Sequence, residues 1–162
     1  MAEQIGIIGA GGKMGNWFAN YFVKMGFEVA GYDENNEIKA KSVTKANSLI
    51  GAVLQKQYVF LCIPAKKTPE IVRLVSKEMR RDSFLVDISS QKSKTVAALL
   101  KMPKKINPIC MHPMFGPGTK KIDGKNIIIV PIKDAKKELT TTKLLFPKAN
   151  FVTIDAVEHD KK

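Results

Sequence analysis

A glycine-rich stretch near the start of the chain constrains its fold more than any other feature. The short apolar run at residues 4–8 leads into Gly9-Ala10-Gly11-Gly12-Lys13-Met14-Gly15, and a helical pattern follows over residues 16–22. Such a run is typical of a strand buried on both faces. Glycines allow a tight turn and a close approach of backbone N–H groups to a phosphate, which a helix N-terminus also attracts. This order of strand, glycine turn and helix predicts a dinucleotide-binding βαβ unit.

The glycines fit the G-x-G-x-x-G fingerprint in one of two registers. Counted forward from Gly9, the third glycine position falls on Met14. Counted backward from Gly15, the second glycine is Gly12 and the first position falls on Ala10. Alanine is the smallest substitute for glycine, which allows the second register. We assign the whole loop to cofactor binding, namely Gly9, Ala10, Gly11, Gly12, Lys13, Met14 and Gly15.

An acidic residue after the next predicted strand strengthens this interpretation. Residues 27–33 form an apolar run that ends at Asp33. The separation from Gly15 is close to the roughly 20 residues expected before the carboxylate that binds the adenosine ribose hydroxyls. An acid there repels a 2′-phosphate, so the pattern favours NAD over NADP. The alternative is a solvated aspartate at the end of a strand.

The remaining chain alternates between predicted strands and helices. This alternation predicts an α/β fold with a doubly wound, mainly parallel sheet of the Rossmann type and helices on both faces. Helices are expected at about 36–50, from Thr68 as N-cap with proline at the first position, at about 92–101 and at about 134–146. Further strands are expected at 57–64, 83–88, 108–111, 126–131 and 151–154.

Length, cysteine usage and hydropathy bound the class of protein. The 162 residues correspond to one domain of ordinary size. Cys62 and Cys110 lie in apolar runs, which predicts reduced core thiols and a cytoplasmic protein. No apolar stretch approaches the ~20 residues of a membrane span, so no membrane partner is expected. The N-terminus also lacks the pattern of a secretory signal.

The net charge of +12 comes mainly from scattered lysine doublets. Nucleic-acid surfaces rely on arginine and interleaved aromatic residues, whereas aromatic residues make up only 7% of this chain. We therefore predict a solvated lysine-rich surface and no nucleic-acid partner. A positive field would also attract anionic ligands such as a dinucleotide and a dicarboxylate.

Ligands of doubly wound sheets bind beyond the carboxyl ends of the strands, so the residues there are the candidates for chemistry. Ile63 and Pro64 follow the third predicted strand and form an apolar wall for an adenine or nicotinamide ring. Polar residues follow the fourth strand at 87–93, and His112 follows the fifth. A histidine there can accept a hydroxyl proton near pH 7, although it could also simply cap the strand end.

The other polar candidates each carry two interpretations. Ser90 could form a hydrogen bond beside His112, or it could be the N-cap of the helix that starts near residue 91. Lys92 could bind an anionic group of the substrate, or it could be a surface lysine in the first helical turn. His159 is interpreted as a surface residue or as the start of a connecting helix.

Four segments together resemble the prephenate dehydrogenases of tyrosine biosynthesis. They are the glycine loop 9–15, the Asp-Ile-Ser-Ser-Gln-Lys stretch 87–92, the His-Pro-Met-Phe-Gly-Pro stretch 112–117 and the Ala-Val-Glu-His-Asp stretch 156–160. The resemblance implies oxidative decarboxylation of prephenate, or of its aminated relative arogenate, with NAD and without a metal. It further implies that His112 binds the ring hydroxyl of the substrate and accepts its proton, and that Ser90 forms a hydrogen bond near the same hydroxyl and orients His112. Some members carry a gating acid where this chain has Gly118 and Thr119, so no gate is assigned.

The resemblance also implies an arrangement of domains. Residues 1–155 are expected to form the dinucleotide-binding domain, and residues 156–162 to begin a connection to a helical domain absent from this chain. In the family that domain forms the homodimer and supplies an arginine for the substrate carboxylates. We therefore expect this chain to bind cofactor with little activity. Two alternatives remain: another small NAD(P)-dependent reductase or dehydrogenase, and a non-enzymatic module that senses dinucleotides or binds nucleic acid.

Overall fold

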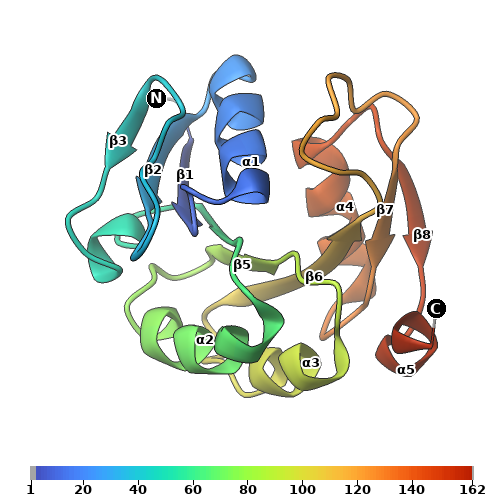
Figure 1. Cartoon of the computed structure of the whole chain (residues 1–162). Coiled ribbons are helices and arrows are strands. Elements are labelled where there is room, and N and C mark those ends of the chain that lie inside the picture. Colours follow the sequence, from blue (N-terminus) through green and yellow to red (C-terminus); the bar gives the residue numbers. More distant parts are fainter. Residues whose placement is uncertain (1–2, 162) are drawn as a thin grey trace.

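The computed structural model describes residues 3–161 (Figure 1). Residues 1, 2 and 162, at the outer ends of the predicted segments 1–155 and 156–162, lie outside the described residues. The strands are β1 (Gln4–Ile8), β2 (Glu28–Tyr32), β3 (Val43–Lys45), β4 (Tyr58–Leu61), β5 (Phe84–Asp87), β6 (Asn107–Pro113), β7 (Asn126–Ile129) and β8 (Asn150–Thr153).

Helices connect most of these strands. They are α1 (Lys13–Lys24), α2 (Thr68–Ser76), α3 (Ser93–Leu100), α4 (Ala135–Leu145), α5 (Ala156–Asp160) and the short 3₁₀ turns η1 (Ile50–Ala52) and η2 (Ala65–Lys67). Within residues 3–161, none of the helices combines the length and the apolar character needed to cross a bilayer.

All eight strands belong to one sheet with the order β3-β2-β1-β4-β5-β6-β7-β8. Strands β1 to β6 are parallel, β7 is antiparallel to β6, and β8 is parallel to β7. The predicted doubly wound, mainly parallel α/β fold is confirmed. The chain moves outward from β1 to β3 and then returns to β4 on the other side of β1. The strand order therefore reverses between β1 and β4, and the carboxyl ends of these two strands form the switch point at which such sheets bind ligands.

Two hydrophobic cores cover the two faces of the sheet. Helices α1 and α4 lie on one face and α2 and α3 on the other (Figure 1). The α1 and α4 face is aromatic, with Phe18, Phe22 and Phe146 completely buried. The opposite core is aliphatic and includes Val75 and Leu99. Burying each such side chain stabilises the fold by about 1.5–3 kcal/mol. The two cores therefore fix the helices against the sheet that carries the candidate site.

The segment 36–50 differs from its prediction as a helix. Ser42 has a positive φ of 63°, which interrupts any helix there, and the residues after it form β3 at the edge of the sheet. Val43 of β3 pairs with Val29 of β2. Ile38 and Ala40, which belong to this segment of helical composition, are buried although their backbone is irregular. The helical prediction was wrong because long-range packing and strand pairing determine this segment.

The start of α2 differs by one residue from its prediction. Thr68 was expected to be the N-cap, but it is the first helical residue, and the cap position belongs to Lys67. The Thr68 hydroxyl lies 3.5 Å from the carbonyl oxygen of Pro64, across the turn η2. Pro69 still occupies the first turn, where its missing N–H is tolerated.

Candidate functional site

The glycine loop is held between the ends of three strands. Gly9 follows β1 with a positive φ of 85°, and a Cβ atom there would lie 2.1 Å from the carbonyl oxygen of Cys62, after β4. The N–H groups of Gly9 and Ala10 both donate to the carbonyl oxygen of Tyr32 in β2, at 2.8 and 3.2 Å. Only glycine fits at position 9, because both the backbone conformation and the close contact exclude a side chain.

Gly12 and Gly15 have different roles in the loop. Gly12 is the N-cap residue of α1, and a Cβ atom on it would meet Gly9 only at an ordinary 3.4 Å. A Cβ atom on Gly15 would lie 2.0 Å from the carbonyl oxygen of Gly9, so α1 packs directly against the loop. The register counted back from Gly15 therefore describes these two glycines, whereas Gly9 rather than Ala10 makes the tight turn.

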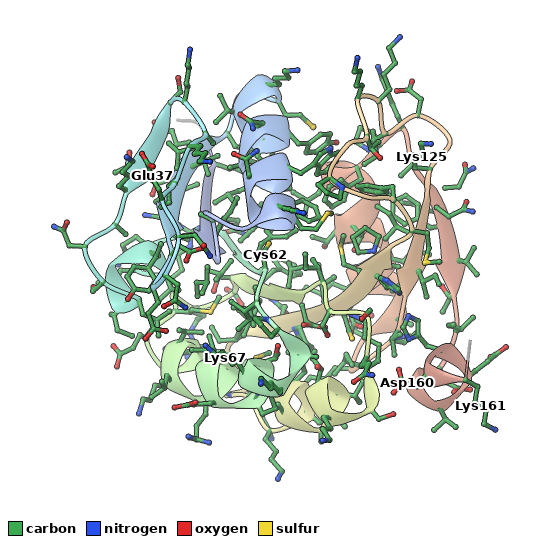
Figure 2. The ribbon with its side chains drawn as sticks, viewed as in Figure 1. Glu37, Cys62, Lys67, Lys125, Asp160 and Lys161 are labelled. Carbon is green, nitrogen blue, oxygen red and sulfur yellow. The ribbon has the colours of Figure 1, made fainter. Side chains whose placement is uncertain are left out.

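A cavity of about 430 Å³ opens at the switch point between β1 and β4. Five residues assigned to the cofactor line it: Gly9, Gly12, Asp33, Ile63 and Pro64. Cys62 also lines it and lies near the centre of the molecule in Figure 2. Other lining residues were not predicted: Asn35 and Asn36 follow β2, Leu49 precedes η1, Lys67 ends η2 and Ile71 lies in α2.

The remaining loop residues lie outside the lining of this cavity. Ala10 and Gly15 are buried and shape the loop from beneath, since their neighbours are β2 and Gly9. Gly11 faces the segment after β2. Lys13 is exposed and Met14 is half-buried on the first turn of α1. Their predicted contacts with a cofactor stay predictions.

Asp33 joins the glycine loop to the segment after β2. Its Oδ2 atom accepts a hydrogen bond from the N–H of Gly11 at 2.9 Å. Its Oδ1 atom accepts from the N–H groups of Asn35 and Asn36 at 3.0 and 2.8 Å. The half-buried carboxylate also borders the cavity. Asp33 is thus more than a solvated residue at a strand end, because it fixes the rim of the cavity and places a negative charge there.

A second, smaller cavity of about 260 Å³ lies beside the carboxyl end of β6. His112, which β6 carries next to its last residue, contributes to the lining together with Ser90 from the loop after β5. The apolar lining includes Met114, Ile128 and Ile154. The strand therefore continues through His112 instead of ending before it, and His112 pairs with Ile128 of β7. The cavity brings together the predicted base and the residue with the predicted hydroxyl, in a lining that is partly apolar.

His112 forms a chain of side-chain contacts with α5. Its Nδ1 atom lies 2.7 Å from Nε2 of His159, and Nδ1 of His159 lies 3.1 Å from Oδ1 of Asp160. His159 is only 6% exposed, so its interpretation as a surface residue was wrong. It lies in the last turn of the short helix α5, and the start of a connecting helix there stays a prediction. Sequence reasoning missed this contact because 47 positions separate the two histidines.

The carboxylate of Asp160 caps helix α3 from a distant part of the chain. It accepts hydrogen bonds from the N–H groups of Lys92 and Ser93 at 2.8 and 2.9 Å and from the Ser93 hydroxyl at 2.5 Å. These donors, the Ser93 hydroxyl foremost, hold the pKa of Asp160 well below its usual value. Figure 2 shows Asp160 on the side of α5 that faces α3. The carboxylate thereby anchors both α3 and His159.

Several neighbours lower the pKa of His112 from its ordinary value of 6.5. Burial contributes most, followed by the positive charge of Lys92 and the neighbouring His159, while Asp87 acts in the opposite direction. The imidazole is therefore neutral at neutral pH and has a lone pair available to accept a proton.

Lys92 lines neither of the two cavities and is buried. The predictions that it binds the substrate and that it is a surface lysine were both wrong. The side chain is 0% exposed, so it is not a surface lysine. Its Nζ atom contacts Asp87 Oδ2 at 2.8 Å and the carbonyl oxygen of Met111 at 2.5 Å. Direct binding of an anionic substrate group is excluded in this arrangement, because the ammonium group is enclosed by its partners. Lys92 instead acts on His112 through its charge.

Ser90 is exposed and lines the cavity of His112, but it does not cap the following helix. Helix α3 begins at Ser93 with Lys92 in the cap position, and the carboxylate of Asp160 satisfies its first N–H groups. The interpretation of Ser90 as an N-cap was therefore wrong. Ser90 is free of that task and lines the same cavity as His112.

Neither cysteine is part of a disulfide. Burial raises the pKa of the Cys62 thiol, and burial likewise raises the pKa of Cys110 to about 12, so both are protonated and unreactive at neutral pH. Among residues 3–161, no group of three or more histidine, cysteine, aspartate or glutamate side chains is placed to hold a metal ion.

Known proteins share this sequence pattern and fold. Residues 18–151 match the family described as prephenate dehydrogenase, nucleotide-binding domain. A probable arogenate/prephenate dehydrogenase of Methanocaldococcus jannaschii is 30% identical over 168 residues, which cover 97% of this chain and 37% of that protein. The chain thus spans little more than a third of the length of this relative.

Solved structures of related enzymes have the same fold. The crystal structure of prephenate dehydrogenase from A. aeolicus, in complex with hydroxyphenyl propionate and NAD⁺, aligns with a TM-score of 0.80 and 25% identity. The alignment covers 99% of this chain and 62% of that chain. Synechocystis arogenate dehydrogenase aligns with a TM-score of 0.81 at 15% identity over 98% of this chain and 62% of its own, which shows the likeness in fold alone.

Proposed function

This chain belongs to the prephenate dehydrogenase nucleotide-binding domain family, and on that premise we propose that it binds NAD for the oxidative decarboxylation of prephenate or arogenate. The observation that carries the proposal is the pair of cavities along one edge of the sheet. One is built on the glycine loop and Asp33, and the other on His112 and Ser90. Cofactor and substrate would lie side by side there.

The residues of the first cavity fit a dinucleotide. Gly12 has no side chain and lies at the N-terminus of α1. The pyrophosphate would accept hydrogen bonds from backbone N–H groups there and would be attracted by the positive end of the helix. Asp33 at the rim would accept hydrogen bonds from ribose hydroxyls and repel a 2′-phosphate, which supports NAD over NADP. Ile63 and Pro64 would form an apolar surface beside a base or nicotinamide ring.

The residues of the second cavity fit the removal of a hydroxyl proton. NAD, when bound, accepts a hydride from the substrate. The side chain of His112 is neutral and half-buried, so it would take the proton of the ring hydroxyl as a general base. The hydroxyl of Ser90 would hold the same substrate oxygen in reach of the imidazole. The apolar wall opposite would exclude water, and the chain would contribute mainly by positioning the two reactants.

Substrate recognition is proposed to need more than this chain. The relatives named above are longer than the part that aligns here. Lys92, the residue predicted to bind an anionic group, is buried in an ion pair with Asp87, so we expect another group to bind the substrate carboxylates. We expect that group, and the homodimer contact of the family, to lie in a further helical region joined through residues 156–162. Losing a charged contact of this kind costs about 2–5 kcal/mol, which predicts little activity for the isolated chain.

The cysteines and the distribution of charge support a cellular location and a class of partner. Two protonated, unpaired thiols match a reducing compartment, and we assign the protein to the cytoplasm. The partner is a small molecule rather than nucleic acid, because the excess positive charge is scattered lysine without interleaved aromatic residues.

The proposal is tested by mixing the chain with NAD and prephenate or arogenate and following NADH. The expected result is saturable NAD binding with slow or undetectable NADH formation. Joining the chain to the further region found in its relatives should restore turnover, and His112→Asn in that longer protein should abolish it. Unaltered turnover in His112→Asn would overturn the role proposed for His112.

A further inference from the structure

We propose that His159 is a positioning residue that selects the tautomer of His112. In this arrangement His159 accepts a hydrogen bond from the Nδ1–H group of His112 and thereby leaves Nε2 of His112 unprotonated, as the atom that takes the substrate proton. The inference deepens the proposed function, since it rests on His112 as the base. It assigns a role to His159 and to Asp160, which lie next to each other in α5.

The carboxylate of Asp160 fixes the direction of the hydrogen bonds at one end of this series of contacts. The carboxylate of Asp160 accepts hydrogen bonds from two backbone N–H groups and one hydroxyl, so it is ionised and can only accept. Its Oδ1 atom lies 3.1 Å from Nδ1 of His159. That nitrogen must therefore carry the hydrogen. In a neutral imidazole the other nitrogen, Nε2, is then an acceptor.

The same rule applies to the next contact. Nε2 of His159 lies 2.7 Å from Nδ1 of His112, and two nitrogens at this distance need one hydrogen between them. Since Nε2 of His159 accepts, Nδ1 of His112 donates. The remaining nitrogen of His112 then carries a lone pair, which is the state that a general base requires.

The surroundings hold this arrangement in place. His159 is buried and the two rings meet at 66° with centroids 4.9 Å apart, so rotation of either ring is restricted. Asp160 is fixed by its bonds to the start of α3. After His112 takes a proton, its Nδ1–H group stays hydrogen-bonded to His159. The carboxylate of Asp160, on the other side of the His159 ring, offsets the new positive charge. A base oriented by a second group that is itself held by a carboxylate follows the logic of catalytic triads.

The alternative direction of the hydrogen bond has a distinct signature. If His159 were an imidazolium, both of its nitrogens would donate, and Nδ1 of His112 would accept. Nε2 of His112 would then carry the hydrogen and could not act as a base. The two arrangements therefore differ in which nitrogen of His112 is bare, and this difference can be measured directly.

The test is nitrogen NMR of the imidazole rings in this chain at a pH of about 8, above the ordinary pKa of histidine. The chain has only two histidines, so the spectrum of His112→Asn assigns both rings. The expected result is hydrogen on Nδ1 and a bare Nε2 in both histidines. Hydrogen on Nε2 of His112 would overturn the proposal.

Two substitutions separate positioning from general packing. His159→Phe keeps the ring volume but removes the acceptor, and it should abolish the preference of His112 for hydrogen on Nδ1. His159→Gln offers an amide oxygen in the same region and should retain the preference in part. A preference that survives in His159→Phe contradicts the proposal, and if that variant does not fold, the tautomer of the wild-type chain decides the question. The measurement needs neither NAD nor substrate, so its failure is distinguishable from failure of the proposed function.

Discussion

The Oδ2 atom of Asp33 accepts a hydrogen bond from the backbone N–H of Gly11, at 2.9 Å. This contact joins the end of β2 to the loop that follows β1, the two segments that together form the rim of the larger cavity. One carboxylate thus shapes the glycine loop and supplies the charge that would select the cofactor. A substitution of Asp33 should therefore change both the shape of the glycine loop and the choice of cofactor.

Replacement of Asp33 by serine should change both cofactor affinity and cofactor choice. We expect Asp33→Ser to weaken NAD binding at least tenfold, or about 1.4 kcal/mol, and to shift the ratio of affinities toward NADP. Titration calorimetry with both dinucleotides measures this. Glu34→Gln is the matched control, because it removes one negative charge from the lining of the same cavity without a bond to the glycine loop. Equal effects of the two substitutions would show that only the overall charge matters.

Substitution by alanine should affect stability at one glycine of the loop and cofactor binding at another. Gly15→Ala places a methyl group 2.0 Å from a backbone oxygen, so we expect the free energy of unfolding to fall by about 3 kcal/mol. Gly12→Ala meets only an ordinary contact, so stability should change little while NAD binding weakens. Urea unfolding and calorimetry on both variants separate the two effects. A stable Gly15→Ala variant would contradict the packing described for α1.

The buried pair of Lys92 and Asp87 should show strong coupling. Lys92→Met leaves the Asp87 carboxylate buried without its partner and should cost about 3–5 kcal/mol of stability. The double variant Lys92→Met with Asp87→Asn removes both charges and should recover most of that loss. A double-mutant cycle by urea unfolding measures the coupling energy. Additive effects of the two substitutions would contradict the described ion pair.

The lowered pKa of His112 predicts a specific dependence of stability on pH. The folded chain binds fewer protons at His112 than the unfolded chain between the lowered pKa and 6.5, so the free energy of unfolding should rise with pH through this window and level off above it. The charged or titratable neighbours of His112 are Lys92, His159 and Asp87. Asp160, whose pKa is lowered from 3.8, contributes only in more acidic solution, where protonation removes its stabilising effect. Urea unfolding of His112→Gln between pH 5 and 7 should show a smaller slope than the wild-type chain; an equal slope would assign the effect elsewhere.

Local patterns predicted the central part of the fold. The glycine loop, the acid at position 33 and the buried runs before Cys62 and Asp87 are each specified by neighbouring residues, and β1, β2, β4 and β5 follow in the expected order. The edge of the sheet was harder to predict. β3 has only three residues, with Val43 half-buried and the rest exposed, so its pairing depends on β2 more than on its own sequence.

The second cavity could be predicted only in part, because its key contacts join distant segments. His112 and Ser90 were identified from their places after strands. Lys92 is buried against Asp87, five residues earlier at the end of β5, and against the carbonyl oxygen of Met111 in β6. Lysine is usually exposed, so the residue type gave no sign of this burial. The contact of His159 with His112 depends on the return of the chain through β7 and β8, and a terminal histidine among charged residues gives no sign of it.

Parallel calorimetric titration of this chain with NAD, NADP and prephenate tests the central claim most directly. We predict that NAD binds with measurable affinity, that NADP binds more weakly, and that prephenate gives no heat without the further region that recognises its carboxylates. Asp33→Ser should reduce the NAD signal in the same experiment. Absence of binding by either dinucleotide to a folded chain would contradict the role assigned to the glycine loop and every proposal that depends on it.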